Sequence, residues 1–397
     1  MPSNHTIPRR RALQWISAGL GASAMNSSLA LASVNKDAES PRLVVIMLRG
    51  ALDGLAAVPA LGDPAWSSLR GHEATNTDTS ENHVLQGTIF ALHPALKNLQ
   101  RWWNERQLLV LHAIASPYRE RSHFDAQQLL ESGGSQPFAL QDGWLGRALN
   151  ATGKSALALC PAMPLALRGS AHASTWTPGF LSTHDEDFSS RIAGLYKNDE
   201  PMANAWSHAL AQQGLVRESG QSFMSPATRV NGFVSLARQA GAFLSSAQGS
   251  RVAWLETGGW DTHTQQANRL MRELTGLDNG LGALRESLGA HWIRTTVVVM
   301  TEFGRTAMIN GSGGTDHGTG GVAFLAGGAV AGGQVLTDWP GLSSKQLLNG
   351  RDLRPTQDIR SLIAAVLQRQ FGFSTVQLQA EVLPGAVSAE RLGLWRS

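Results

Sequence analysis

Cysteine is almost absent from the sequence, since Cys160 is the only one among 397 residues. A single thiol excludes an internal disulfide and a thiolate metal cluster, and we interpret Cys160 as a small buried apolar residue. Charge is also scarce, at 16% of residues against 42% hydrophobic ones, which excludes an intrinsically disordered chain. Long apolar runs are missing too. None reaches the roughly 18 residues that a transmembrane helix needs, so we expect no membrane span.

The body of the chain carries almost no net charge. The formal charge of +3 comes from Arg9, Arg10 and Arg11, since removing these three from the 33 basic residues leaves 30 against 30 acidic ones. A neutral body of this kind gives no reason to expect a nucleic-acid partner.

The N-terminus has the layout of a secretory signal. The basic cluster at 9–11 precedes a mildly apolar run over 12–25, and Ala30-Leu31-Ala32 fits an A-x-A cleavage site. The paired arginines indicate the twin-arginine route. We therefore expect residues 1–32 to be a signal peptide read by the twin-arginine export machinery. The mature chain would be periplasmic or secreted.

The rest of the sequence alternates strand and helix patterns. Continuous apolar runs, typical of strands buried on both faces, lie at 43–48, 108–115, 251–255 and 295–301. Leucines at helical spacing over 267–290 and apolar residues over 356–371 predict helices. This alternation predicts a three-layer α/β/α sandwich with a mostly parallel sheet, as one domain over 33–397. The Gly/Ser-rich stretch 135–250 leaves open an inserted cap or a set of long loops.

Polar side chains follow each predicted strand, where ligands bind in open α/β sheets. These strand-end residues are Asp53 after the first run, Ser122 and His123 after the second, Asp261 and His263 after the third, and Glu302, Arg305, Asp316 and His317 after the fourth. Asp, Glu and His at several strand ends predict a metal site of oxygen and nitrogen ligands. Two cations about 3.5–4 Å apart could clamp a phosphoryl or sulfuryl displacement.

Structural interpretations remain open for several of these residues. Asp53 could be a helix cap, Asp261 and His263 a hydrogen-bonded pair, and Glu302 and Arg305 an ion pair. The sequence has no G-x-S-x-G or H-E-x-x-H motif, so a common serine hydrolase or a zincin is unsupported.

Taken together, these motifs resemble the bacterial family DUF1501, exported proteins related to the alkaline phosphatase and sulfatase superfamily. The matching segments are LRGALDGL at 48–55, ALHPAL at 91–96, SPYRERSHFDAQ at 116–127, DGWLGRAL at 142–149, GGWDTH at 258–263, TEFGRT at 301–306, NGSGGTDHGTGG at 310–321 and GRDLRPTQDIR at 350–360.

The resemblance implies an alkaline-phosphatase-like fold with one or two divalent cations (Zn, Mn, Mg or Ca) at the edge of the sheet. The implied metal ligands are Asp53, Asp261, His263, Glu302, Asp316 and His317. The chain departs from the superfamily at two positions. Asp261-Thr262-His263 is shorter than the usual Asp-x-x-x-His, and Thr301-Glu302 stands where relatives have an Asp-His pair.

The implied catalytic residues are Ser122, His123 and Arg305. Ser122 matches the superfamily nucleophile, which begins the helix after the second strand, and His123 is the alternative nucleophile, a base or a ligand. Ser122 could equally be only a helix N-cap. Arg49, Arg121 or Arg305 would hold the anionic ester.

We therefore expect an exported metal-dependent hydrolase of phosphate or sulfate esters, acting on a small anionic ester or a polysaccharide. The alternative is a non-catalytic exported protein that uses the same loops to bind a polysaccharide or a partner at the cell surface. The missing Asp-His pair favours the alternative, and the density of strand-end ligands favours the enzyme. A single site requires Asp261, His263, Asp316 and His317 to converge in space.

Export through the twin-arginine route can be tested directly. Changing Arg9 and Arg10 to Lys removes the pair that the export machinery reads, so the precursor should remain in the cytoplasm. Cell fractionation and immunoblotting measure the result. Normal levels of the mature variant in the periplasm would show that this assignment is wrong.

Overall fold

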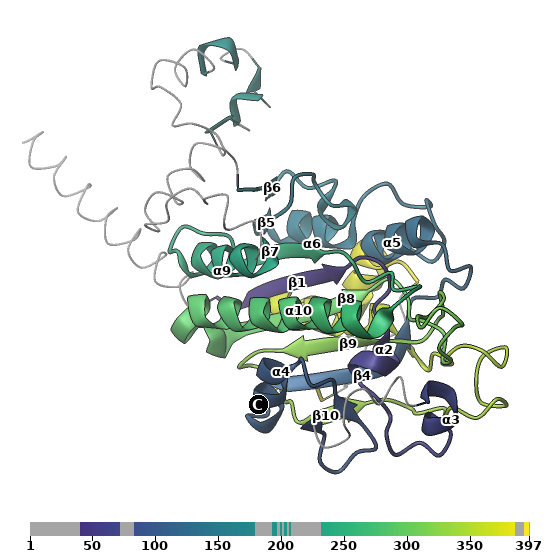
Figure 1. Cartoon of the computed structure of the whole chain (residues 1–397). Helices are drawn as coiled ribbons and strands as arrows, with labels where there is room; N and C mark the ends of the chain where they lie inside the picture. The colour runs from purple at the N-terminus through teal and green to yellow at the C-terminus, as the bar shows by residue number, and fades with distance from the viewer. Residues whose placement is uncertain are drawn as a thin grey trace, which may run out of the picture. The chain divides into compact units, whose positions relative to one another are not determined.

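A nine-stranded sheet organises the computed structural model of the chain (Figure 1). In sheet order its strands are β10 (Gln334–Leu336), β4 (Leu108–Ala115), β9 (Gly321–Ala326), β8 (Thr295–Thr301), β1 (Arg42–Leu48), β7 (Val252–Thr257), β5 (Ala156–Ala158) and β6 (Ala173–Thr175), with β11 (Gln357–Asp358) beside β4. β9 runs antiparallel to its neighbours β4 and β8, and the other described pairings of this sheet are parallel. The mostly parallel sheet predicted from the sequence is confirmed.

The structure describes residues 40–71, 83–178, 193–196, 199–200, 202–204, 206–207, 232–385 and 393–396. The signal peptide predicted over 1–32 lies outside these residues. Among the described helices, none has both the length and the apolar character to cross a membrane.

Helices cover both faces of the sheet because β1 is apolar on both sides. Val44 and Ile46 pack into one core cluster, and Leu43 and Val45, which point the opposite way, pack into the other. The helices of the first side are α4 (Lys97–Asn104), α9 (Gly232–Ser245) and α10 (Gln266–Leu288), and those of the second are α6 (Trp144–Thr152) and α11 (Ile359–Phe371). The three-layer α/β/α sandwich is thereby confirmed.

Shorter elements complete the described fold. They are α2 (Gly54–Ala57), α3 (Trp66–Arg70), α5 (His123–Ser132), α12 (Thr375–Gln377), the antiparallel pair β2 (His83–Val84) and β3 (Ala91–Leu92), the 3-10 helices η1 (Leu165–Leu167) and η3 (Gly289–Arg294), and the π-helix η4 (Leu378–Val382). α11 begins at Ile359 rather than near Thr356, because Asp358 pairs with β4 and caps the helix with its side chain.

The described parts of 135–250 belong to the sandwich. α6 and α9 cover its two faces, and β5 and β6 extend the sheet beside β7. Most of residues 179–231 lie outside the described residues, so the choice between an inserted cap and a set of long loops stays open there.

Asp53 has a structural role in place of the metal-binding role expected from the sequence. It caps α2 by accepting from the backbone N–H of Leu55 and Ala56, and it forms a buried ion pair with Arg70 at 2.6 Å. Gln266 donates to the same carboxylate at 2.7 Å. Although burial alone would raise it, the Arg70 guanidinium holds the pKa of Asp53 below its ordinary value. Both carboxylate oxygens are already engaged, so we leave Asp53 out of the metal ligands.

Removing this carboxylate should destabilise the fold. Asp53→Ala leaves the Arg70 guanidinium buried without its partner, so the free energy of unfolding should fall by about 3–5 kcal/mol in a denaturant titration. Glu286→Ala is the control, because it removes the exposed pair with Arg238 and should cost about 0–1 kcal/mol. Equal losses in the two variants would contradict the structural role of Asp53.

Candidate metal centre

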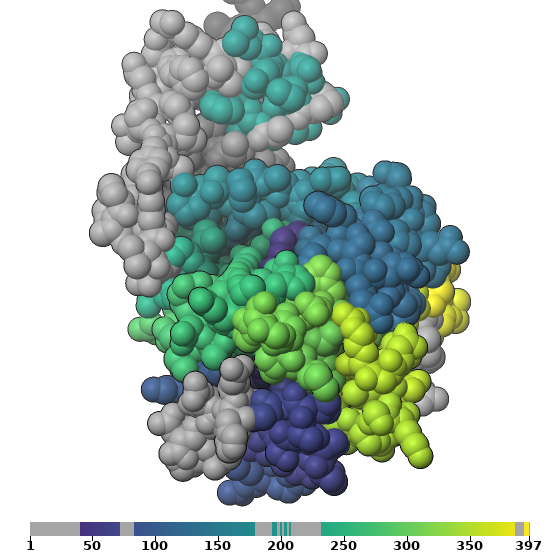
Figure 2. All heavy atoms as spheres, turned by 45° about the vertical axis from the view of Figure 1, so that its right-hand side comes forward, coloured from purple at the N-terminus to yellow at the C-terminus, as the bar shows by residue number. Residues whose placement is uncertain are grey.

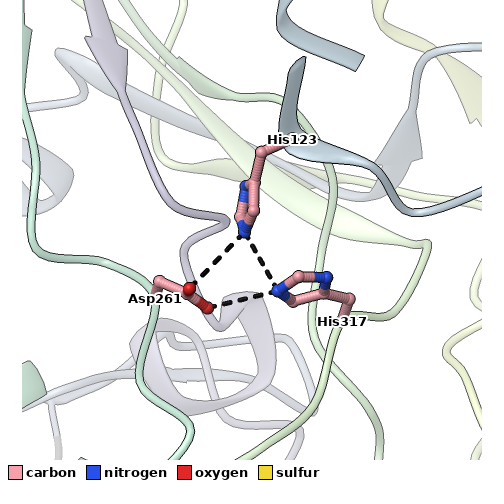
Figure 3. A group of neighbouring side chains, drawn as sticks. All are labelled: His123, Asp261 and His317. Carbon is pink, nitrogen blue, oxygen red and sulfur yellow. Dashed lines mark hydrogen bonds and ion pairs between the residues drawn. The ribbon is translucent and has the colours of Figure 1, made fainter. Parts of the chain in front are cut away.

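Three side chains from separate loops meet beyond the carboxyl ends of the parallel strands (Figure 3). His123 begins α5 after β4, Asp261 follows β7, and His317 precedes β9. One ligand atom of each lies within 4.8 Å of the others. The Nε2 atoms of His123 and His317 are 3.0 Å apart, and His317 Nε2 is 3.3 Å from an Asp261 oxygen. This set of three, His123, Asp261 and His317, is called the metal triad below.

His263 lies against two members of the metal triad. Its Nε2 is 2.9 Å from Asp261 Oδ1 and 3.0 Å from His317 Nε2. Its Nδ1 is 3.3 Å from Asp316 Oδ1, and the Asn310 side-chain amide donates to the same oxygen. The structure thus brings Asp261, His263, Asp316 and His317 together, with Asp316 behind His263 rather than facing the triad.

Glu302 lies behind His123 and fixes its ring. The Glu302 carboxylate accepts from His123 Nδ1–H at 2.8 Å, from the Gln127 amide at 2.9 Å and from the Gly50 N–H at 2.8 Å. Although burial alone would raise it, these hydrogen bonds hold the pKa of Glu302 below its ordinary value. Instead of the ligand role expected from the sequence, Glu302 has the position of a group that orients a metal-binding histidine.

A backbone carbonyl performs the same task for His317. His317 Nδ1 lies 3.0 Å from the carbonyl oxygen of Arg121. Because a carbonyl oxygen only accepts, Nδ1 carries the hydrogen in this bond. The neutral ring therefore presents the lone pair of Nε2 toward the metal triad.

The hydrogen bonds direct three imidazole lone pairs toward one region. Nδ1 of each of His123, His263 and His317 lies beside a hydrogen-bond acceptor, and in the neutral tautomer that donates to this acceptor the Nε2 atom is unprotonated. The hydrogen bond to Glu302 raises the pKa of His123 and burial lowers that of His317, so one proton could bridge this pair. One proton can bridge only one pair of facing Nε2 atoms, whereas a cation can accept the lone pairs of all of them.

The separations of these atoms fit a metal site. Four ligands about 2.0–2.1 Å from a tetrahedral zinc ion lie roughly 3.3 Å from one another. The ligand atoms of the metal triad are 3.0–3.6 Å apart. A histidine that binds a metal through one ring nitrogen typically donates the N–H of its other ring nitrogen to a carboxylate or a carbonyl. The residues present therefore fit a divalent cation.

Arg305 supports Asp261 and is not free to hold a substrate. Its side chain is fully buried and donates to Asp261 Oδ1 at 2.6 Å. Its other guanidinium nitrogens donate to the hydroxyl and the carbonyl of Thr315. Although burial alone would raise it, Arg305 holds the pKa of Asp261 below its ordinary value. The contacts give Arg305 a positioning role instead of the ester-binding role expected from the sequence.

Ser122 is the N-cap of α5. Its hydroxyl accepts from the backbone N–H of Asp125 at 3.5 Å, which matches the capping alternative for this residue. Its role as a nucleophile stays a prediction. The next residue, His123, is the member of the metal triad in this segment.

Two residues in contact with this site were missed in the sequence. Gln127 links Glu302 to Arg49, since its carbonyl oxygen accepts from Arg49 at 2.8 Å. Arg49 in turn pairs with Glu131 and Glu256, so it is not free to hold an ester. Asp352 binds Arg121 through an ion pair at 2.8 Å. Gln127 and Asp352 both lie in segments that carry the family resemblance, which is the one signal that could have found them.

The chain has a distant structural similarity to sulfatases of known structure. A putative sulfatase from Bacteroides thetaiotaomicron shares 11% identity, with 89% of this chain and 74% of that one covered at a TM-score of 0.42. The PsFucS1 sulfatase from Pseudoalteromonas sp. shares 12%, with 85% and 69% covered at a TM-score of 0.40. At these scores the likeness carries no functional argument.

Sequence comparison gives a firmer result for the family. No curated protein matches the chain. The family model described as "Protein of unknown function (DUF1501)" matches residues 112–385, which is more than half of the chain. The chain therefore belongs to the DUF1501 family.

Proposed function

We propose that the protein is an exported metal-dependent hydrolase of phosphate or sulfate esters. The observation that carries this proposal is the convergence of imidazole Nε2 lone pairs and the Asp261 carboxylate at one point of the sheet edge. A cation bound there would polarise an ester oxygen and make a hydroxyl or water nucleophile available near neutral pH.

The donor set favours one zinc ion. Imidazole nitrogen suits Zn²⁺, whereas Mg²⁺ and Ca²⁺ prefer oxygen ligands. Three protein ligands with a position left for substrate are typical of catalytic zinc sites, and the metal triad supplies three. Glu302 and the Arg121 carbonyl hold the two histidines of the triad in the tautomer that zinc requires.

His263 is the proposed acid–base residue. It borders the metal triad, and 42% of its side chain is exposed, so a substrate can reach it. Asp316 accepts from its Nδ1–H, so Nε2 can take a proton from the nucleophile and later return it to the leaving group.

An anionic ester suits the charges around the triad. The N-terminus of α5, a helix of ten residues, lies at His123 and carries partial positive charge. Together with the cation, this end of the helix favours the oxygens of a phosphate or sulfate group. Arg121, whose side chain is 28% exposed, is paired with Asp352 and adds positive charge nearby.

Metal binding and turnover separate the proposed roles. The purified mature chain should hold about one zinc ion by elemental analysis, and His123→Ala and His317→Ala should lose most of it. His263→Ala should keep the zinc but lose hydrolysis of aryl phosphate and sulfate esters, because acid–base groups contribute about 10²–10⁴-fold. His172→Ala, at an exposed histidine away from the triad, is the matched control.

Two outcomes would contradict the proposal in different ways. A wild-type chain that binds no divalent metal would exclude the metal centre. A chain that binds zinc but turns over nothing on a broad ester panel would favour the non-catalytic binding protein.

Ser122→Ala tests whether this hydroxyl is the nucleophile. As the N-cap of α5, Ser122 should contribute about 1 kcal/mol to the free energy of unfolding, so the variant should be slightly less stable yet keep its zinc and turnover. Thermal unfolding and ester hydrolysis are measured on the same sample. Loss of turnover with zinc still bound would instead identify Ser122 as the nucleophile.

A further inference from the structure

Asp352 contacts two connections of the metal centre, the one between β4 and α5 and the one between β8 and β9. Its buried carboxylate accepts from Arg121 Nε at 2.9 Å and from the Thr319 hydroxyl at 2.7 Å. Its backbone forms an isolated antiparallel bridge with Thr306. Each partner is close in sequence to a residue of the site: Arg121 to His123, Thr319 to His317 and Thr306 to Arg305. In Figure 2 the blue, green and yellow-green segments that contain these positions meet on one face.

Arg121 adopts an unusual backbone conformation. Its φ of +62° lies in the left-handed region, which residues with a side chain rarely occupy and which is often retained at functional sites. In this conformation its carbonyl accepts the hydrogen bond from His317 Nδ1. The guanidinium is held by Asp352 through both Nε and Nη2, at 2.9 and 2.8 Å.

We propose that the Arg121–Asp352 ion pair is a latch that positions His317. The latch holds Arg121 in its left-handed conformation, and the fixed carbonyl then directs the Nε2 lone pair of His317 at the cation. The inference rests on the proposed metal centre. Arg121 is thereby a positioning residue, in place of the ester-binding role expected from the sequence.

Arg351 provides a matched comparison within the same cluster. It donates to the other oxygen of Asp352 at 3.1 Å, and 41% of its side chain is exposed. It therefore shares the charge partner of Arg121, but His317 donates to the carbonyl of Arg121. A general effect of charge or stability would affect both arginines, whereas the latch requires Arg121 alone.

The experiment measures zinc affinity of the full mature chain by calorimetry, with Co²⁺ absorption as a second readout of ligand geometry. Arg121→Gly and Asp352→Asn should weaken zinc binding by roughly 10–100-fold, as expected for groups that orient metal ligands. Arg351→Gln should bind zinc as the wild type does. Arg121→Gly should fold, because glycine adopts a positive φ without steric cost.

Each contrary result has a distinct meaning. Wild-type affinity and Co²⁺ spectrum in Arg121→Gly would overturn the latch, even if Asp352→Asn fails to fold. An equal loss in Arg351→Gln would show a general charge effect and would also overturn it. Absence of zinc binding in the wild type would overturn the metal centre itself, and the latch with it.

Discussion

The Nδ1 hydrogen bonds of three histidines are the constraint on which the site depends. A free imidazole interconverts between tautomers, and a site that needs the Nε2 lone pair requires an acceptor at Nδ1. Here the acceptors are the Glu302 carboxylate, the Arg121 carbonyl and the Asp316 carboxylate. They come from two different connections, Arg121 from the one between β4 and α5, and Glu302 and Asp316 from the one between β8 and β9, so the chemistry of the site is set by tertiary structure and not by any one motif.

The charges around the metal centre are a second constraint. Asp261 and Glu302 are both held as carboxylates, and Glu302 is fully buried. The Arg305 guanidinium contacts Asp261, whereas His123 contacts Glu302. Burying the Glu302 carboxylate is unfavourable without positive charge nearby, so the site favours positive charge at His123, carried either by a proton or by a cation bound to its Nε2.

The sheet and much of the site's membership could be predicted from the sequence. Strands buried on both faces are continuous apolar runs, and residues after parallel strands must meet at one edge. β9 was not predicted, since its six apolar residues after a Gly-rich loop could belong to a strand or a helix. The roles of the individual site residues were less predictable. The pairing of Asp53 with Arg70, and the place of Glu302 behind His123, depend on side-chain directions that spacing does not specify.

The buried groups around the histidines distinguish a metal centre from a binding surface without a metal. A surface that recognises a polysaccharide or a protein can use histidines in either tautomer, because water completes their hydrogen bonds. This centre instead buries Glu302 and Arg305 completely to orient His123 and Asp261, and keeps Arg121 in the left-handed region beside His317. Groups of this kind persist where surrounding contacts hold them and where function requires fixed geometry. A metal ion with a defined set of ligands has that requirement, so these contacts support the proposed metal centre, on which the proposed hydrolase depends.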